Sequence, residues 1–382
     1  MKMKKIADQQ KINNKNKYFH QYCLKKIINC LEHPNSTEIQ SNKINTSSPK
    51  SKKKDISRLI YSKKYNLLIG VTYKSELILY SSSIENNFKI LQIFKLSEYS
   101  EPITDIIEIN NEKLLLSILN HGLKLYKITI IKEENKLLYF ISNENGFNEI
   151  HNYSNFAIEH IIQNNNFNNK ISNVILSCDI CNKEIKIWKN NSEDVYEIDA
   201  YLRLPQNCQS LFSINKNEIM GLLKNKIIFI DYPKVLSIFY INNVKLNTWK
   251  STIIKINENY IIVGGEDYFY LVSIYYRQVI TTYENLDYIY MNIVYLSETN
   301  SVLMSKYKKN EREYSIDEYI FDRKYQELIF VGNVINSKFI CKKINSVIEL
   351  EDNDNIKNNM DKSRKKNVLI CDGYTFEIWC IE

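Results

Sequence analysis

The feature that most constrains this chain is a pair of apolar strands around a polar turn, which recurs along most of its length. Leu67–Tyr80 is an example, LLIGVTYKSELILY, in which two runs rich in β-branched and aromatic residues flank the turn. Internal repeats of this kind determine the whole fold. Seven hairpins are predicted, at Leu67–Tyr80, Leu114–Ile128, Val174–Lys189, Ile219–Tyr232, Ile261–Ile274, Val302–Phe321 and Val368–Ile381.

Further apolar strands flank these hairpins, so that the repeating unit has four strands. It returns at a spacing of roughly 40–47 residues wherever no insertion interrupts it. Seven such units predict an all-β fold, a seven-bladed β-propeller of four-stranded antiparallel blades, in which each sheet buries its faces against its neighbours. The flanking strands are Pro102–Ile109, Ser251–Ile256 and Ile289–Leu296 before hairpins, and Phe88–Leu96, Val235–Ile241 and Gln278–Glu284 after them.

Composition supports a folded chain of 382 residues, long enough for two ordinary domains or one large repeat fold. It is 44% hydrophobic and 25% charged, and its 8 Gly and 5 Pro exclude collagen-like and linker classes. Two polar tracts, Ile161–Asn173 and Leu350–Lys366, interrupt the repeat. We predict that both are surface loops, because they lack the apolar content of a core.

Three repeats resemble those of the WD-repeat propellers, at Leu176–Lys189, Gly264–Ile274 and Ile370–Trp379. They share small residues, an Asp-centred turn and an apolar strand, which ends in Trp at Trp188 and Trp379. The resemblance extends over roughly residues 56–382 and implies a propeller with protein partners on one face or at a blade edge.

The repeats also depart from the family pattern. The Gly-His dipeptide that opens a typical repeat is absent, and neither Trp188 nor Trp379 is followed by Asp. Tyr80, Tyr126 and Tyr232 occupy roughly the Trp position in other repeats. The fold prediction rests on period and pattern, whereas no functional subfamily follows from motifs this degenerate.

The last unit ends at Glu382 and has no fourth strand of its own. An open sheet edge invites aggregation, and the family resemblance implies that an N-terminal strand fills the gap. The nearest candidate is TEIQSNKI, Thr37–Ile44.

Charge divides the chain into a basic N-terminal extension, residues 1–54, and a repeat body, residues 55–382. The extension carries a net charge of +10 and the body −3, within a total of +7. A nearly neutral body lacks the electrostatic footprint of a nucleic-acid-binding protein, so we predict no nucleic-acid partner for it. The lysines of Lys50–Lys54 read as a solvated linker, with a nuclear-import signal as the alternative.

No apolar run approaches the ~18–20 residues of a membrane span, and no apolar stretch follows the basic N-terminus as in a secretory signal. The 8 Cys therefore read as reduced thiols. These features predict an intracellular, cytoplasmic protein, with a nuclear location as the alternative.

The clearest metal-like spacing is H-x2-C-x6-C-x2-H, formed by His20, Cys23, Cys30 and His33. Two His and two Cys are a suitable tetrahedral zinc set, and the spacing faintly resembles half of a B-box zinc finger. The competing interpretation is a short amphipathic helix over YFHQYCLKKIINCLEH. On one helix His20 and His33 would be about 20 Å apart, too far to share an ion. We predict a helical or irregular extension, with the zinc site as the alternative.

Other candidate chemistry is sparse. Cys178 and Cys181 have C-x-x-C spacing but fall in a predicted turn between strands, whereas a redox motif opens a helix. Gly264 and Gly265 read as a hairpin turn, and Glu351 with Asp352 as a solvated pair. The remaining cysteines considered, Cys208, Cys341, Cys371 and Cys380, read as small buried apolar residues.

Catalytic patterns are missing from the sequence. His121, His151 and His160 lie in no nucleophile context, and there is no P-loop or dinucleotide fingerprint. The string Tyr275-Tyr276-Arg277-Gln278 has one Arg where phosphoinositide-binding propellers have a pair. No catalytic, cofactor-binding or metal residues are therefore predicted, and no cofactor.

The sequence thus predicts a non-catalytic interaction scaffold or adaptor, monomeric within a larger complex. Rigid elements would hold partner-binding loops in place, and the 28 Tyr would supply adaptable contacts. The alternative is a zinc-bearing adaptor in ubiquitin-type signalling, built on His20, Cys23, Cys30 and His33.

Overall fold

The computed structural model describes residues 22–29 and most of residues 56–381. In this part of the chain the regular structure is β-strand without helix, and the strands form seven four-stranded sheets. The internal positions not described are 63, 84–87, 97–100, 110–112, 134–135, 145, 148–154, 166–169, 180–181, 191–194, 233–236, 247–251, 266, 285, 298, 309–312, 337–345, 351–365 and 372–374.

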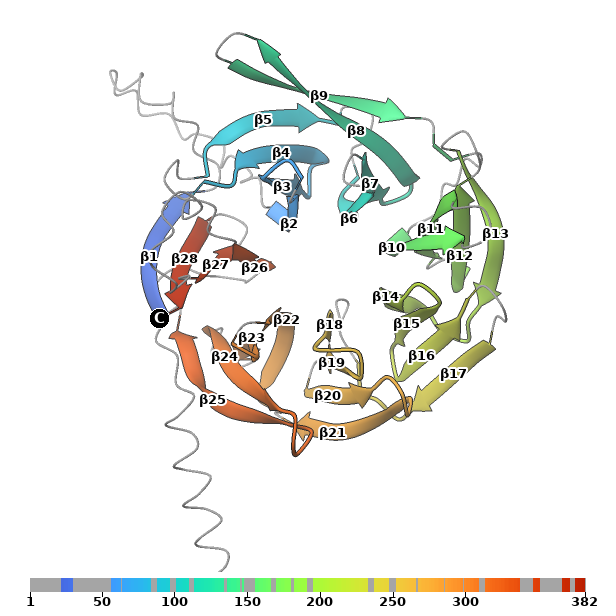
Figure 1. Cartoon of the computed structure of the whole chain (residues 1–382), viewed down its shortest axis with the longest axis vertical. Helices are drawn as coiled ribbons and strands as arrows, with labels where there is room; N and C mark the ends of the chain where they lie inside the picture. Colours follow the sequence, from blue (N-terminus) through green and yellow to red (C-terminus); the bar gives the residue numbers. More distant parts are fainter. Residues whose placement is uncertain are drawn as a thin grey trace, which may run out of the picture. The chain divides into compact units, whose positions relative to one another are not determined.

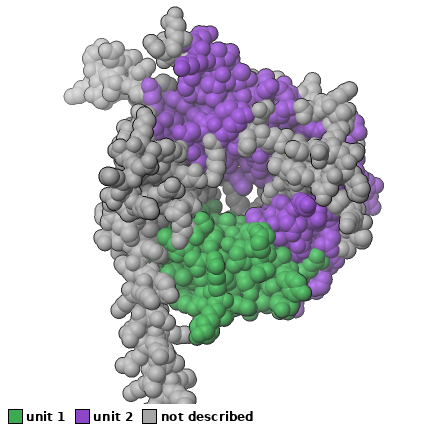
Figure 2. Space-filling view, viewed as in Figure 1, with its two compact units in different colours: residues 1–27, 245–372, 376–382 green, residues 28–244, 373–375 purple. Residues whose placement is uncertain are grey.

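The chain divides into two compact units, shown in Figure 2. Unit 2, residues 28–244 and 373–375, holds four sheets whose strands follow one another in chain order. Within it the first strands lie along the inner side of an arc and the last strands along its outer side (Figure 1). The sheets are β2 (Ile56–Ser62), β3 (Leu67–Thr72), β4 (Glu76–Ser81), β5 (Ile90–Lys95); β6 (Ile103–Ile109), β7 (Lys113–Ile118), β8 (Gly122–Glu133), β9 (Lys136–Glu144); β10 (Asn155–Asn165), β11 (Lys170–Asp179), β12 (Glu184–Asn190), β13 (Tyr196–Arg203); and β14 (Cys208–Asn215), β15 (Glu218–Leu223), β16 (Lys226–Asp231), β17 (Ser237–Asn242).

Unit 1, residues 1–27, 245–372 and 376–382, holds the other three sheets. Two follow chain order, and the third takes a strand from the beginning of the sequence. The sheets are β18 (Thr252–Lys255), β19 (Tyr260–Gly264), β20 (Tyr268–Ser273), β21 (Gln278–Glu284); β22 (Tyr288–Leu296), β23 (Ser301–Lys308), β24 (Glu313–Asp322), β25 (Glu327–Asn336); and β26 (Ser346–Leu350), β27 (Lys366–Cys371), β28 (Thr375–Ile381), with β1 (Tyr22–Asn29) beside β28.

All seven predicted hairpins are confirmed as the second and third strands of the seven sheets, and the six flanking strands are confirmed as well. The reason lies in the packing of these middle strands. β7 is buried at all but its first position, because its side chains enter two cores in turn, one shared with the sheet of β2–β5 and one shared with the sheet of β10–β13. Burial on both faces requires a continuous apolar run, which is visible in a sequence. The outer strands alternate instead, as in β13.

The turns repeat one arrangement of backbone hydrogen bonds. In the turn between the first and second strands, one backbone carbonyl group accepts a hydrogen bond. The donor is the backbone N–H of the residue that follows the third strand. The N–H of Tyr232 donates to Asn217 over 2.9 Å, and that of Ile274 donates to Asn259 over 2.8 Å. The turn after the first strand and the turn after the third strand are thereby fixed to each other at the same end of the sheet.

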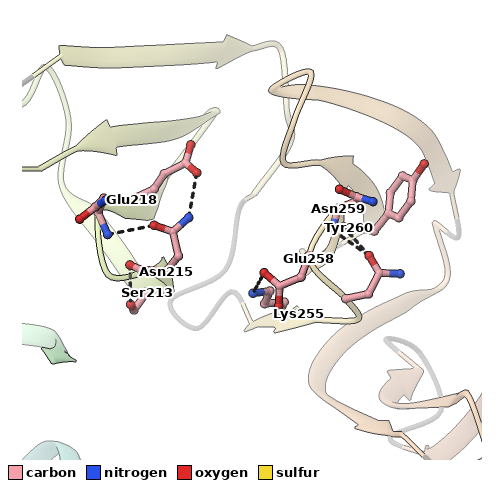
Figure 3. Close-up of polar contacts among 9 residues, drawn as sticks. Ser213, Asn215, Glu218, Lys255, Glu258, Asn259 and Tyr260 are labelled. Atoms are coloured by element: carbon pink, nitrogen blue, oxygen red, sulfur yellow. Dashed lines mark hydrogen bonds and ion pairs between the residues drawn. The ribbon is translucent and has the colours of Figure 1, made fainter. Parts of the chain in front are cut away.

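Asn side chains stabilise the first of these turns in two sheets (Figure 3). Asn215 Oδ1 accepts from the N–H of Asn217 over 2.9 Å, and Asn257 Oδ1 accepts from the N–H groups of Asn259 and Tyr260 over 2.8 and 3.1 Å. An Asn side chain that closes on nearby backbone in this way stabilises a tight turn without glycine. This explains how a chain with 8 Gly forms so many turns.

The prediction of a helix in the N-terminal extension is wrong for Tyr22–Asn29, which is strand β1. The predicted N-terminal fourth strand of the last sheet does exist, but β1 forms it beside β28. The candidate for that position, Thr37–Ile44, lies outside the described residues. The spacing of apolar residues in YCLKKIIN suits a helix, and pairing with β28 overrides it.

The prediction of a surface loop at Ile161–Asn173 is also wrong for most of that tract. Ile161–Asn165 belong to β10 and Lys170–Asn173 to β11, and they pair in register from Ile161 with Val174 to Asn165 with Lys170. Pairing satisfies the backbone groups of a polar tract as well as those of an apolar one. The other tract, Leu350–Lys366, lies outside the described residues apart from its two ends, which belong to β26 and β27.

Two buried Lys–Asp ion pairs lie within these sheets. In unit 1, Lys306 Nζ of β23 lies 2.7 Å from Asp317 Oδ2 of β24, and both side chains are at most 9% exposed. In unit 2, Lys186 of β12 pairs with Asp179 of β11 over 3.4 Å. Burial raises the pKa of Asp317, and the adjacent ammonium group of Lys306 offsets part of that desolvation effect.

Candidate interaction surfaces

The most exposed aromatic side chains of the described residues lie in two turns of unit 1, residues 274–277 and 323–326. We call them the tyrosine turns. Each joins the third strand of a sheet to the fourth, β20 to β21 and β24 to β25. Tyr275 and Tyr276 are 79% and 67% exposed, and Tyr325 is 64% exposed. Large aromatic groups exposed to this degree are typical of residues that bury surface against another molecule.

The backbone of both turns is fixed by side chains at the end of the preceding strand. Ser273 Oγ accepts from the N–H of Tyr276 over 3.2 Å, and Asp322 Oδ1 accepts from the N–H of Tyr325 over 3.2 Å. Arg277 and Gln326 then take left-handed conformations, with φ of 49° and 52°. The tyrosines are therefore held on turns of defined geometry, which lowers the entropy lost when they bind.

The surroundings of the tyrosine turns are polar and charged. Lys324 Nζ lies 5.0 Å from the ring centroid of Tyr325, and Arg323 beside it is exposed. At the other turn, the Ile274–Asn259 hydrogen bond brings the Asn257 turn alongside, with Lys255 paired to Glu258 over 2.8 Å (Figure 3). Aromatic groups next to basic ones suit a partner that presents apolar groups together with carboxylates.

A second exposed surface lies on the long hairpin of β8 and β9 in unit 2, which forms the outer side of its sheet (Figure 1). One face of this hairpin packs inward, where Ile130, Tyr139 and Ile141 contact the core shared with β5. On the other face Ile131 is paired with Leu138 in register, and Phe140 with Thr129. Ile131 and Phe140 are 43% and 49% exposed. We call this the outer hairpin face.

The first strands of unit 2 are linked by one buried carboxylate. Asp105 of β6 is 3% exposed and accepts from the N–H of Ile158 in β10 over 3.2 Å. Its other oxygen lies 2.8 Å from Arg58 Nη1 of β2. Asp105 thus bridges three successive sheets. This arrangement stabilises the unit and leaves no free group for chemistry.

The cysteine and tryptophan residues of the third sheet are part of the core. Cys178 is buried next to Cys208 of the following sheet, and burial together with the Cys208 hydrogen bond raises the pKa of the Cys178 thiol. A buried thiol with a raised pKa is a poor nucleophile and metal ligand. Cys181 lies outside the described residues, as do the side chains of Cys341, Cys371 and Cys380. Trp188 donates its indole N–H to Ser177 Oγ over 3.0 Å.

Buried tyrosines take the place of tryptophan in other repeats, as the sequence indicated. Tyr80, Tyr126 and Tyr232 are at most 5% exposed. Tyr232 donates its hydroxyl group to Asp199 over 2.7 Å, and burial raises its pKa.

The Gly264-Gly265 turn is confirmed, since the N–H of Gly265 donates to the carbonyl of Tyr268 over 2.8 Å between β19 and β20.

The described residues hold no group of three or more His, Cys, Asp or Glu side chains that could bind a metal ion. Of the predicted histidines, His121 is paired with Glu101 over 2.8 Å, whereas His151 and the side chain of His160 are not described. His20, Cys30 and His33 lie outside the described residues, as do Glu351 and Asp352. The strand weighs against a site shared by Cys23 and Cys30, because an extended β1 puts Cys23 about 20 Å from Asn29.

No helix in the described part of the chain has the length and apolar character that crossing a membrane requires.

No protein-family model matches the chain, and no curated protein sequence matches it significantly. Solved structures do match. The structure of U3-55K superposes with a TM-score of 0.58, covering 86% of this chain and 95% of that one at 10% identity.

The crystal structure of the RRP9 WD40 repeats matches equally well, with a TM-score of 0.58, 10% identity and coverage of 86% and 94%. The fold is that of WD40-repeat β-propellers. Sqt1 of Saccharomyces cerevisiae agrees, with a TM-score of 0.56 and 12% identity over 84% of this chain and 83% of that one. At these identities the similarity shows the fold alone. It confirms the coarser part of the prediction, an all-β fold of four-stranded antiparallel sheets like that of WD40-repeat propellers.

Sequence reasoning missed the tyrosine turns. The string Tyr275-Tyr276-Arg277 fails as a lipid-binding motif, and the useful signal is its position between two predicted strands. Two adjacent side chains point in different directions, so two neighbouring tyrosines in a turn cannot both be buried in the same core. Tyr325, which follows Arg323 and Lys324, carries the same signal.

Proposed function

We propose that this chain is a non-catalytic protein-interaction scaffold: a seven-bladed WD-repeat-like propeller formed by residues 55–382, with a basic extension at residues 1–54. A cytoplasmic location fits this role, and Lys50–Lys54 would allow nuclear import. The observation that supports a scaffold best is the pair of tyrosine turns, which expose Tyr275, Tyr276 and Tyr325 on fixed backbone.

Binding at the tyrosine turns has an energetic basis in their side chains and their fixed backbone. Tyrosine is enriched among residues that contribute most to interface affinity, often by ~2 kcal/mol or more each when buried by a partner. The side-chain hydrogen bonds from Ser273 and Asp322 order the turns in advance, so less conformational entropy is lost on binding. Arg323 and Lys324 favour a partner with carboxylates at its rim.

The test is quantitative affinity purification of the full chain and of a variant with Tyr275, Tyr276 and Tyr325 changed to Ala. Because these side chains are exposed, the variant should keep the melting temperature of the wild type. We expect it to lose its stable protein partners. The matched control changes Tyr73 and Tyr201 to Ala, which are exposed tyrosines of unit 2, and should retain them.

If the tyrosine-turn variant keeps the same partners in the same amounts as the wild type, these turns are not the binding surface. If the wild-type chain retains no protein partner at all, the scaffold function itself is refuted.

A further inference from the structure

The outer hairpin face belongs to an edge strand. In the described part of the chain, β9 is hydrogen-bonded as a strand to β8 alone, so the backbone groups on its other side have no strand partner. An exposed edge of this length is a template for another strand. Its central residues, Leu137–Ile141, include no charge, proline or glycine, which are the usual devices against edge pairing.

The exposed side chains add apolar area at the same place. On the outer hairpin face Phe140 is 49% exposed, with Ile131 of β8 beside it at 43%. The inner face of the hairpin is already occupied by the core shared with β5. A strand added to β9 would therefore extend a sheet that is packed on one side and would cover apolar groups on the other.

We propose that the occupant of this edge is a second copy of the chain, with β9 of each copy paired antiparallel about a two-fold axis at Phe140. The charges of β9 support this choice, because the strand begins with Lys136 and ends with Glu144. An antiparallel pair centred on Phe140 sets position 136 of each copy opposite position 144 of the other. Opposite charges then face each other at both ends, and the two phenylalanines face each other in the middle.

The neighbouring register is less favourable. Centring the pair on Tyr139 would put Lys136 opposite Ser142 and would leave Glu144 beyond the first residue of the partner's β9, so neither charge would have an opposite charge facing it. A two-fold contact is the commonest symmetry of oligomers, and it needs a self-complementary surface. A strand that carries a base at one end and an acid at the other is self-complementary in this sense. The proposal replaces the monomer predicted from the sequence, and it does not depend on the tyrosine turns.

The test is sedimentation velocity of the full-length chain over about 1–100 μM, the range expected for a small interface. The wild type should shift from one chain to two as concentration rises. Phe140→Lys should remain a monomer throughout. Phe239→Lys is the matched control, since Phe239 is 45% exposed on the outer strand β17 of the same unit, and it should dimerise like the wild type.

Charge reversal tests the register itself. Lys136→Glu and Glu144→Lys each place like charges opposite each other at two positions, so each should weaken dimerisation at least about tenfold. Mixing the two variants restores opposite charges at both positions, and a dimer should form again in the mixture. Because Glu144 also pairs with Lys113 over 2.9 Å, a melting curve checks that each variant is folded.

A wild type that stays monomeric up to about 100 μM overturns the proposal. So does a mixture of the two charge variants that dimerises no better than either alone. Dimerisation that is unaffected by Phe140→Lys would place the contact elsewhere and likewise overturn it. None of these outcomes bears on partner binding at the tyrosine turns.

Discussion

Replacing Lys306 by Met would leave the carboxylate of Asp317 buried without its counterion. The two side chains are 9% and 2% exposed, and Asp317 Oδ1 has no hydrogen-bond partner among the described residues. The ammonium group also lies 4.1 Å from the ring centroid of Tyr288, so the substitution removes a second electrostatic contact. Breaking a buried ion pair on one side costs about 3–5 kcal/mol, and we expect Lys306→Met to lower the free energy of unfolding by that amount at pH 7.

The cost should depend on pH in a defined direction. Burial raises the pKa of Asp317 in the folded state, and the loss of Lys306 raises it further. The folded state therefore binds a proton at a higher pH than the unfolded state does, so the free energy of unfolding increases as pH falls through the folded-state pKa. The deficit of Lys306→Met should accordingly be largest at pH 7 to 8 and smaller near pH 5.

Urea unfolding followed by circular dichroism at both pH values measures this deficit. Lys255→Met is the control, because its partner Glu258 is 86% exposed, and a surface pair is worth at most about 1 kcal/mol. The double variant Lys306→Met, Asp317→Leu removes the stranded charge and should recover most of the loss. The reasoning is refuted if Lys306→Met costs no more than Lys255→Met, or if its deficit does not shrink at acid pH.

Two further substitutions and truncations test the fold. Gly221→Ala should lower the free energy of unfolding by about 1–3 kcal/mol, because a Cβ there would lie 2.9 Å from Ile228 Cγ1. The control is Gly332→Ala, where an added Cβ would have no atom within 4 Å. In the same urea titration its free energy of unfolding should stay within about 0.5 kcal/mol of the wild type. Deletion of residues 1–29 removes β1 and should lower the melting temperature and promote aggregation through the bared edge of β28. Deletion of residues 1–21, which leaves β1 in place, should do neither, and equal melting of the two truncations would contradict the role of β1.

The sequence was most informative where burial is two-sided. β7 is apolar at almost every position, because the sheets before and after it in unit 2 cover both of its faces. That pattern needs no knowledge of partners, and it gave the hairpins, their order and the four-stranded unit. An all-β fold of four-stranded antiparallel sheets follows from that unit.

Prediction failed where a distant segment decides the structure. β1 has apolar spacing that suits a helix, and only the open position beside β28 makes it a strand. The polar ends of β10 and β11 are strand because the two segments pair with each other through their backbones. The tyrosine turns were missed for a different reason: tyrosine is also a core residue here, as at Tyr80, so composition alone does not separate exposed tyrosines from buried ones.

The sheet of β26, β27, β28 and β1 has a consequence for how the protein is made. β1 ends at Asn29 and β28 begins at Thr375, so a ribosome synthesises most of the chain between the two strands. At a synthesis rate of ~5–20 residues per second, β1 has no β28 to pair with for roughly 20–70 s. Over that time its backbone groups are available to chaperones and to other nascent chains, whereas each sheet of unit 2 can form soon after its own strands emerge. The last sheet is therefore the part of this protein whose assembly depends most on the pace of translation.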